Sequence, residues 1–202
     1  MDNDVLKAAA GWAGFQLSPA MVAGLRQLED WLSTEGVALG GLGPNEIPNL
    51  TARHIGDSIT FARGWAPHSV APAEIMDLGS GTGLPALPLA ICHPDTMVRA
   101  IDRSARRCRL IRRAARVIGL ENIEVEEADI TRLDRTAPVV VSRAAMPPEL
   151  LLPHLQRVTE PGGVAVVGGS HRTSPEVVGF KTVEIPSEIL DHSAWLLMMA
   201  TP

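Results

Sequence analysis

The chain has 202 residues, of which 46% are hydrophobic and 20% are charged, with a formal net charge of −5. This length fits one domain with a small extension, and the hydrophobic content excludes a disordered chain. No apolar run reaches the roughly 18 residues of a membrane helix, and the acidic start lacks the basic residues of a signal peptide. Two cysteines without close spacing and six scattered histidines predict reduced thiols in the cytoplasm and no metal site.

Residues 1–64 read as a helical extension ahead of a larger domain at 65–202. Ser18 and Pro19 predict a helix start within the helical stretch 2–35, because serine caps free amides and proline suits the first turn. Residues 36–48 hold four glycines and two prolines and predict a loop or hinge. A second helical stretch is expected over about 51–64.

Short apolar runs alternate with helix-length segments from residue 74 onward. The runs are 74–78, 97–102, 123–129, 138–142, 164–168, 181–185 and 195–200. This alternation predicts an α/β domain with a mainly parallel sheet covered on both faces. Too few residues separate the last two runs for a crossover helix, so these runs should form an antiparallel pair at one edge.

The strongest chemical signal is a glycine-rich turn that joins the first predicted strand to a helix. Small residues let the backbone approach a ligand, and the helix start offers unpaired amides. Asp102 ends the second run, where a carboxylate can accept both hydroxyls of a ribose, and Asp129 ends the third, where it can accept from an adenine amino group. The predicted cofactor contacts are Asp77, Gly79, Ser80, Gly81, Gly83, Leu84, Asp102, Arg103, Ala128, Asp129 and Arg143.

Two cofactor classes fit this turn. Gly81, Gly83 and Ala86 match the looser dinucleotide pattern G-x-G-x-x-A, whereas an acidic residue just before the glycines is typical of S-adenosylmethionine methyltransferases. S-adenosylmethionine carries a sulfonium and an ammonium but no phosphate, so Asp77 suits its cations and would repel a pyrophosphate. The turn therefore favours S-adenosylmethionine over a dinucleotide, and over a turn that only joins strand to helix.

On these residues the chain resembles the glucose-inhibited division protein B (GidB) family of 16S ribosomal RNA guanine-N7 methyltransferases. The resemblance runs from about Asn49 to Val167. Its segments are Asn49-Leu50-Thr51, Arg53-His54-x-x-Asp57-Ser58, Asp77 to Pro85 followed by Pro88-Leu89-Ala90, Leu120 to Ile123, and Ser142-Arg143-Ala144. It implies a Rossmann-like class I fold that uses S-adenosylmethionine and acts on ribosomal RNA or the small ribosomal subunit.

Three residues are expected to act in methyl transfer. His54 and Asp57 lie three positions apart on one helix face, and the resemblance places that face over the cofactor pocket; a buried pair that only pins the helix is the alternative. Arg143 follows an apolar strand and should emerge beside the transfer centre, where it can bind a phosphate or a guanine edge, unless it only pairs with a carboxylate. Phe61 and Trp65 are the candidates for stacking on a base.

An arginine-rich helix is predicted over the segment after Asp102. Seven arginines fall between positions 103 and 116, which carry +7 while the remainder carries −12. At 100° per residue, one side of this helix holds Arg106, Arg109, Arg112, Arg113 and Arg116. No anion on the helix compensates them, so we expect RNA contact rather than a merely solvated face.

The substrate stays open at this stage. The segment after the fifth strand, Gly168 to Arg172, and the final hairpin, His192 to Trp195, differ from the basic residues usual in the family. A methyltransferase acting on another RNA or a small molecule, and a protein that binds cofactor or RNA without turnover, are therefore the alternatives to 16S rRNA methylation.

Overall fold

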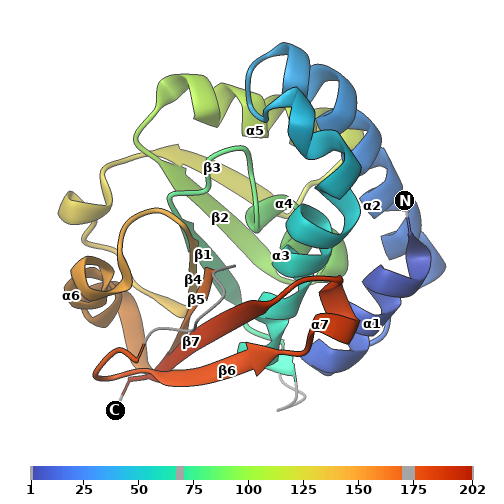
Figure 1. The fold of residues 1–202 in the computed structure, drawn as a ribbon. Coiled ribbons are helices and arrows are strands. Elements are labelled where there is room, and N and C mark those ends of the chain that lie inside the picture. Colours follow the sequence, from blue (N-terminus) through green and yellow to red (C-terminus); the bar gives the residue numbers. More distant parts are fainter. Residues whose placement is uncertain (1, 67–70, 170–175, 202) are drawn as a thin grey trace.

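The computed structural model describes residues 2–66, 71–169 and 176–201. A seven-stranded sheet with the order β3-β2-β1-β4-β5-β7-β6 forms its centre (Figure 1). The strands are β1 (Glu74–Leu78), β2 (Met97–Asp102), β3 (Ile123–Glu127), β4 (Ala137–Arg143), β5 (Thr159–Gly169), β6 (Lys181–Ile185) and β7 (Ala194–Ala200). Strands β1 to β5 pair in parallel, while β7 runs antiparallel to both β5 and β6. The predicted parallel sheet and its antiparallel edge pair are confirmed.

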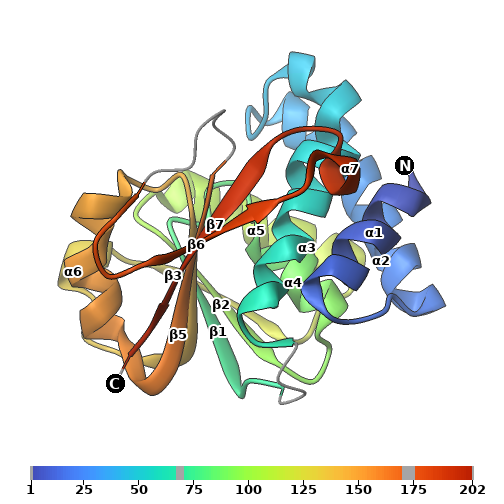
Figure 2. The ribbon, with the colours of Figure 1, turned by 60° about the horizontal axis from the view of Figure 1, so that its bottom comes forward.

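Helices cover both faces of the sheet, as the viewpoint of Figure 2 shows. Helices α4 (Ala86–Cys92) and α5 (Ala105–Ile118) lie on one face, and α6 (Pro148–Val158) lies on the other. Successive residues of a strand point to opposite faces, so Ile75 joins the first core and its neighbour Met76 the second. This arrangement leaves the C-terminal ends of the parallel strands as the place for a ligand.

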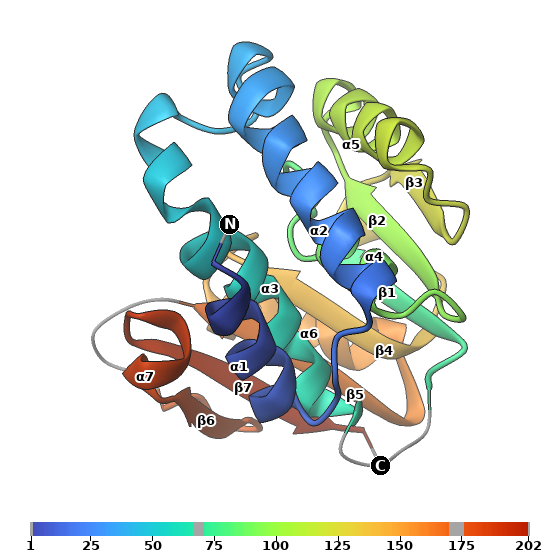
Figure 3. The same cartoon turned by 90° about the vertical axis from the view of Figure 1, so that its right-hand side faces the viewer.

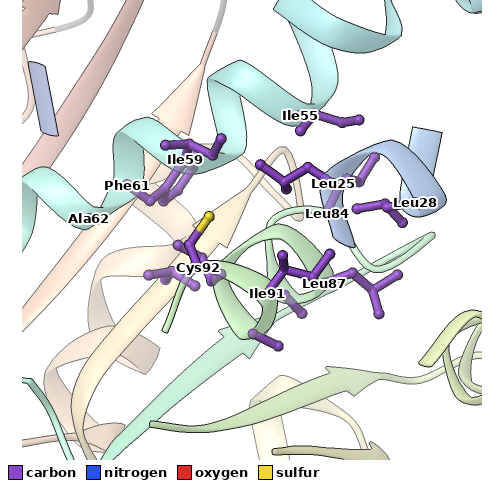
Figure 4. Close-up of a cluster of buried hydrophobic side chains, with 14 of the residues drawn as sticks. Leu25, Leu28, Ile55, Ile59, Phe61, Ala62, Leu84, Leu87, Ile91 and Cys92 are labelled. Carbon is purple, nitrogen blue, oxygen red and sulfur yellow. The ribbon is translucent and has the colours of Figure 1, made fainter. Parts of the chain in front are cut away.

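The N-terminal helices add a layer outside α4. They are α1 (Asn3–Ala13), α2 (Pro19–Trp31) and α3 (Asp57–Thr60), and α1 lies beside α3 while α2 lies beside α5 (Figure 3). Ser18 caps α2 by accepting from the Met21 N–H at 3.2 Å. Leu25 and Leu28 of α2 pack in the cluster that holds Leu87 and Ile91 of α4 (Figure 4). The N-terminal helices and the sheet therefore share one hydrophobic core, and the boundary at 64/65 stays a prediction.

The segment between α2 and α3 is more helical than expected. A π-helical turn, Leu32–Gly36, continues α2, and a 3-10 helix, Pro44–Asn49, falls in the stretch predicted as a loop. Proline at the first position of the 3-10 helix favours this start, because its missing N–H needs no partner there. The stretch 51–64 is helical as predicted but is divided into a π-helix (Leu50–Gly56), α3 and a 3-10 helix (Phe61–Gly64).

The remaining short helices lie at strand ends. A 3-10 turn, Ile130–Arg132, follows β3, and α7 (Ser187–Leu190) lies between β6 and β7. Strand β3 ends at Glu127, so Ala128 and Asp129 lie beyond it rather than within the predicted run. No helix among the described residues is long and apolar enough to cross a bilayer.

Candidate active site

The turn after β1 forms the floor of the candidate site. The backbone N–H groups of Gly79 and Ser80 donate to the carbonyl of Ile101 at 2.8 and 2.9 Å and so tie the turn to β2. Gly79 and Gly81 have φ values of +75° and +60°, which residues with side chains rarely adopt. A Cβ at Gly79 would also lie 2.6 Å from the Cβ of Ala145. Glycine is therefore required here, and the turn presents bare backbone at the edge of the sheet.

Asp102, at the end of β2, holds the turn from one side. Its Oδ2 accepts from the Gly81 N–H and its Oδ1 from the Ser104 N–H, each at 2.9 Å. One guanidinium nitrogen of Arg107 lies 3.6 Å from Oδ2. A carboxylate has room for roughly four hydrogen bonds, so Asp102 keeps acceptor capacity for a ligand hydroxyl although its side chain is largely covered.

Asp77 lies beneath the turn and is fully buried. Its Oδ2 accepts from the N–H of Ala86, the first residue of α4, at 3.1 Å, while its Oδ1 has no partner within the described part of the chain. Burial raises the pKa of this carboxyl from 3.8 to about 7. A buried oxygen without a donor is costly, and a cation bound at the turn would reduce that cost.

A cavity of about 930 Å³ opens over the turn and joins it to the N-terminal layer. The predicted residues that line it are His54, Asp57, Gly79, Ser80, Gly81, Leu84 and Arg143. Asp77, Gly83 and Asp102 are buried in or beside the turn without lining the cavity, and Arg103, Ala128 and Asp129 lie outside the lining. The structure thus brings the turn and the three predicted transfer residues together around one space.

Arg143 connects the sheet to the N-terminal layer at this cavity. Its Nη1 donates to Oδ2 of Asp57 at 3.2 Å and to the carbonyl of Arg53 at 3.3 Å. Asp57 is buried, and burial raises the pKa of its carboxyl although the charge of Arg143 opposes that shift. The following residue, Ala144, has a φ of +52°, so the chain turns sharply as it leaves β4. The ion pair with a nearby carboxylate that was the alternative role of Arg143 is therefore present, whereas Asp57 pairs with Arg143 rather than with His54.

His54 has a partner that the sequence did not indicate. Its Nε2 lies 2.9 Å from Oε2 of Glu46, in the 3-10 helix before it, while its Nδ1 is buried without a partner in the described chain. Burial lowers the pKa of His54, although the hydrogen bond to Glu46 raises it. A carboxylate can only accept, so neutral His54 carries its hydrogen on Nε2 and keeps a lone pair on Nδ1. The segment that contains Glu46 was predicted as a loop from its glycine and proline content, so Glu46 was not identified as a partner of His54.

Asp129 is placed differently from the strand-end acceptor that was expected. It caps the 3-10 turn, because its Oδ1 accepts from the N–H and the hydroxyl of Thr131 at 2.9 and 2.8 Å. The hydrogen bond from the Thr131 N–H holds the pKa of Asp129 below its usual value. The side chain is exposed, so a contact between Asp129 and an adenine ring stays a prediction.

The five arginines on α5 are not all free of partners. Arg113 forms an ion pair with Glu35, Arg106 donates to the carbonyl of Leu39, and Arg112 donates to the carbonyl of Val125 at 2.7 Å. No anion on α5 itself compensates these arginines, as predicted, but the N-terminal layer and β3 supply acceptors to three of them. A second cavity of about 610 Å³ is lined by Arg109, Arg112, Arg113, Ala115, Arg116, Leu120, Ile123 and Val125.

The two aromatic residues proposed for stacking on a base are in the core instead. Phe61 is fully buried and Trp65 nearly so, and neither lines the cavity. A Cβ at Gly168 would lie 2.2 Å from the Phe61 ring, which shows how tightly that ring packs on β5 (Phe61 is labelled in Figure 4). Trp195 of β7 does line the cavity, and sequence reasoning missed it because its strand reads as uniformly apolar.

No group of three or more histidine, cysteine, aspartate or glutamate side chains within residues 2–66, 71–169 and 176–201 is arranged to hold a metal ion. Both cysteines are buried free thiols. Burial raises the pKa of Cys92 to about 12, so this thiol is inert core packing.

Solved structures with the same fold include proteins of different activity. The cyclase SpnF matches with a TM-score of 0.58 and 16% identity, covering 73% of this chain and 81% of that protein. A SAM-dependent methyltransferase from Aquifex aeolicus matches with a TM-score of 0.50 and 15% identity, covering 64% of this chain and 82% of that protein. The fold is therefore the Rossmann-like fold predicted from the sequence, and a fold alone does not fix a reaction.

Sequence relatives are more specific. A protein of Acidothermus cellulolyticus named Ribosomal RNA small subunit methyltransferase G is 35% identical over 148 residues, covering 73% of this chain and 65% of that protein. A protein of the same name from Frankia alni is 32% identical over 177 residues, covering 84% of this chain and 65% of that protein. The chain therefore spans just under two thirds of the length of these relatives. The family model of GidB, described as rRNA small subunit methyltransferase G, matches residues 21–191, and the chain belongs to this family.

Proposed function

We propose that this protein transfers a methyl group from S-adenosylmethionine to N7 of a guanine in 16S ribosomal RNA. The observation that carries the proposal is the cavity that joins the glycine turn to Arg143, Asp57 and His54 in a chain of the GidB family. These residues come from segments far apart in the sequence, and a single ligand-sized space collects them.

The residues at the turn fit this cofactor. S-adenosylmethionine supplies an electrophilic methyl carbon on a sulfonium centre. Asp102 retains acceptor capacity for ribose hydroxyls, the backbone of Gly79 to Gly81 allows close approach, and the unpaired Oδ1 of buried Asp77 suits a neighbouring cation. A pyrophosphate at the turn would lie close to the Asp102 carboxylate, which disfavours a dinucleotide. We propose Arg103, Ala128 and Asp129 as the adenine side of the same site.

The chain's own contribution to transfer is alignment. Guanine N7 has a lone pair and no proton to lose, so the reaction needs no general base. The rate depends instead on holding N7 about 3 Å from the methyl carbon and in line with the leaving sulfur. Arg143 is fixed by Asp57 and by the Arg53 carbonyl, and His54 is fixed by Glu46. Side chains held by such partners lose less freedom when substrate binds.

The proposed RNA-binding surface is the outer side of α5, with Arg106, Arg109, Arg112, Arg113 and Arg116. Arg109 and Arg116 have no hydrogen bond or ion pair to a described residue, and both line the second cavity with an apolar floor. Cationic rims and apolar floors suit a nucleic acid strand, whose phosphates pair with arginine while its bases cover the apolar surface.

The test is incubation of the purified protein with labelled S-adenosylmethionine and small ribosomal subunits from a strain that lacks this methyltransferase. Label in 16S rRNA that maps to one guanine as 7-methylguanine supports the proposal. A protein that binds S-adenosylhomocysteine but leaves the subunits unlabelled refutes it and favours a different acceptor.

A methyltransferase acting on another RNA or a small molecule is the second candidate. It is supported by the final hairpin, where Trp195 rather than a basic residue borders the cavity. A cytoplasmic location, with no membrane or metal partner, stays a prediction.

A further inference from the structure

The main cavity is positively charged although the whole chain is acidic. The charged residues that line it are three arginines, Arg53, Arg107 and Arg143, and a single aspartate, Asp57. Burial keeps His54 toward its neutral form, since it lowers the pKa of that ring. The formal net charge of the chain is −5, so this concentration of cations is local. S-adenosylmethionine carries a net positive charge and does not neutralise it.

Among these three arginines, only Arg143 has its charge paired at close range with a buried carboxylate of the described chain. The Arg143 guanidinium pairs with buried Asp57. Arg53 makes no ion pair with any residue in the described part of the chain, and its side chain is exposed at the cavity. Its backbone is held in place, because the Arg53 carbonyl accepts from Arg143 at 3.3 Å. The Arg53 charge acts on the Glu46 carboxylate, whose pKa it helps to lower, without forming an ion pair with it. The anchored backbone therefore presents an exposed guanidinium at the cavity.

Arg107 stands on another wall of the same cavity, in the first turn of α5. Its side chain is 56% exposed, and its nearest carboxylate oxygen, on Asp102, is 3.6 Å away. That oxygen already accepts from the Gly81 N–H at 2.9 Å. The contact between Arg107 and Asp102 is therefore long and shared, and little free energy opposes movement of the Arg107 guanidinium to a better anion.

We propose that Arg53 and Arg107 are a phosphate clamp at the cavity, which binds the phosphodiester groups flanking the nucleotide that is to be methylated. The inference rests on the proposed function and names the chemistry of its substrate: the acceptor is a phosphate-bearing nucleotide. A neutral small-molecule acceptor would leave Arg53 without an ion pair and Arg107 with only its long contact to Asp102. Guanidinium groups bind phosphate oxygens through two parallel hydrogen bonds, so two of them on different elements fix the strand as well as hold it.

The clamp differs from the arginine surface on α5. Arg107 was not among the arginines assigned to that surface, and Arg53 comes from the π-helix Leu50–Gly56. In this proposal the clamp binds RNA phosphates beside the glycine turn, whereas the α5 surface binds RNA phosphates farther from the methylated nucleotide. When Arg107 moves to a phosphate, it also uncovers Asp102 for a ribose, so RNA and cofactor should favour each other's binding.

The test compares Arg53→Gln and Arg107→Gln with Arg26→Gln, a matched change of an exposed α2 arginine that lines neither cavity. Fluorescence anisotropy measures the binding of a short single-stranded RNA with one guanine, in the presence of S-adenosylhomocysteine and over a range of salt concentrations. Each clamp variant should lower the slope of log affinity against log salt by about 0.7, the value for one lost contact to a single strand. Arg26→Gln should keep the slope of the parent protein, and Arg107→Gln should bind S-adenosylhomocysteine at least as tightly as the parent.

A second RNA, with uncharged methylphosphonate linkages on both sides of the guanine, identifies the groups bound. The clamp substitutions should have no further effect on this RNA. Clamp variants that keep the parent slope, or that weaken both RNAs equally, overturn the proposal even if the protein methylates ribosomal subunits. Guanosine monophosphate and guanosine distinguish a free nucleotide from a strand. Binding of the monophosphate that depends on Arg53 and Arg107, with no RNA binding, would overturn both the clamp on a strand and the ribosomal substrate, and would assign the two arginines to a free nucleotide.

Discussion

The ion pair between Arg143 and Asp57 allows a direct test of how the cavity is built. The substitution Arg143→Met keeps a long side chain but removes its charge and leaves the carboxylate of Asp57, 4% exposed, without its partner. Breaking a buried ion pair from one side costs about 3–5 kcal/mol. Two features reduce this cost: Arg143 is 17% exposed, and Asp57 can take up a proton. We therefore expect a loss of about 2–4 kcal/mol in the free energy of unfolding.

Proton uptake should make this loss depend on pH. Burial already raises the pKa of Asp57 against the opposing charge of Arg143, and removal of that charge raises it further. Between the unfolded and the folded pKa, the folded variant holds a proton that the unfolded chain releases, so its stability falls as pH rises. Relative to the parent protein, Arg143→Met should therefore lose less stability at about pH 5 than at about pH 8.

Urea denaturation at the two pH values measures the effect, and the double variant Arg143→Met/Asp57→Asn is the control. A neutral amide at position 57 removes the buried charge, so the double variant should recover most of the lost stability, at about 2–4 °C of melting temperature per kcal/mol. Methyl transfer should stay 10- to 100-fold lower in both variants, about 1.4–2.7 kcal/mol of alignment, with S-adenosylhomocysteine affinity within about threefold. An equal loss at both pH values and no recovery in the double variant would refute the reasoning.

Asp102→Ala should weaken S-adenosylhomocysteine binding by about 1–3 kcal/mol in calorimetry, because the ribose and the Gly81 amide lose one acceptor; an unchanged affinity would remove Asp102 from the site. Burial lowers the pKa of His93 from 6.5 to about 4, so only the unfolded chain takes up this proton between those values and stability falls as pH drops. Urea titrations should show this loss, about 3 kcal/mol, in the parent and not in His93→Phe; equal pH slopes would contradict it. Arg109→Gln with Arg116→Gln should flatten the salt dependence of RNA binding by up to about 0.7–0.9 log units per lost contact; parallel salt titrations of variant and parent would show that this face is only solvated.

The pattern of strands could be predicted because it depends on local signals. Apolar runs such as 138–142 are long enough to form buried strands. Each run lies within an observed strand or differs from it by a few residues. The glycine turn could also be predicted. Positive φ values such as +60° at Gly81 require glycine, so the turn leaves a recognisable pattern of glycines in the sequence. Asp102 lies beside the turn as expected because parallel strands end at one edge of the sheet.

The side-chain partners could not be predicted, because they join residues that only the packing of helices brings together. Glu46 and His54 are close in sequence, but the packing of the two short helices that carry them sets the 2.9 Å contact. Glu35, in the π-helical turn after α2, pairs with Arg113 of α5, and the periodicity of neither segment contains that information. Asp129 shows a further limit of local signals: an aspartate after a strand serves equally well as a helix cap, and here it caps the 3-10 turn, while its contact with an adenine ring stays a prediction.

The N-terminal layer is part of the site rather than an addition to it. Asp57 and His54 belong to helices whose buried residues, Ile55 and Ile59, lie in one core with Leu6 and Ala10 of α1. Helix α1 lies before the residues that the family model matches, yet it packs against the helical segments that carry His54 and Asp57. Because Arg143 reaches Asp57 only when α3 is docked on the sheet, loosening of α1 would separate the ion pair and expose both charges to water. The proposed catalytic arrangement and the stability of this layer are thus coupled through one core, and substitutions far from the cavity, in α1, should act on methyl transfer through the position of Asp57.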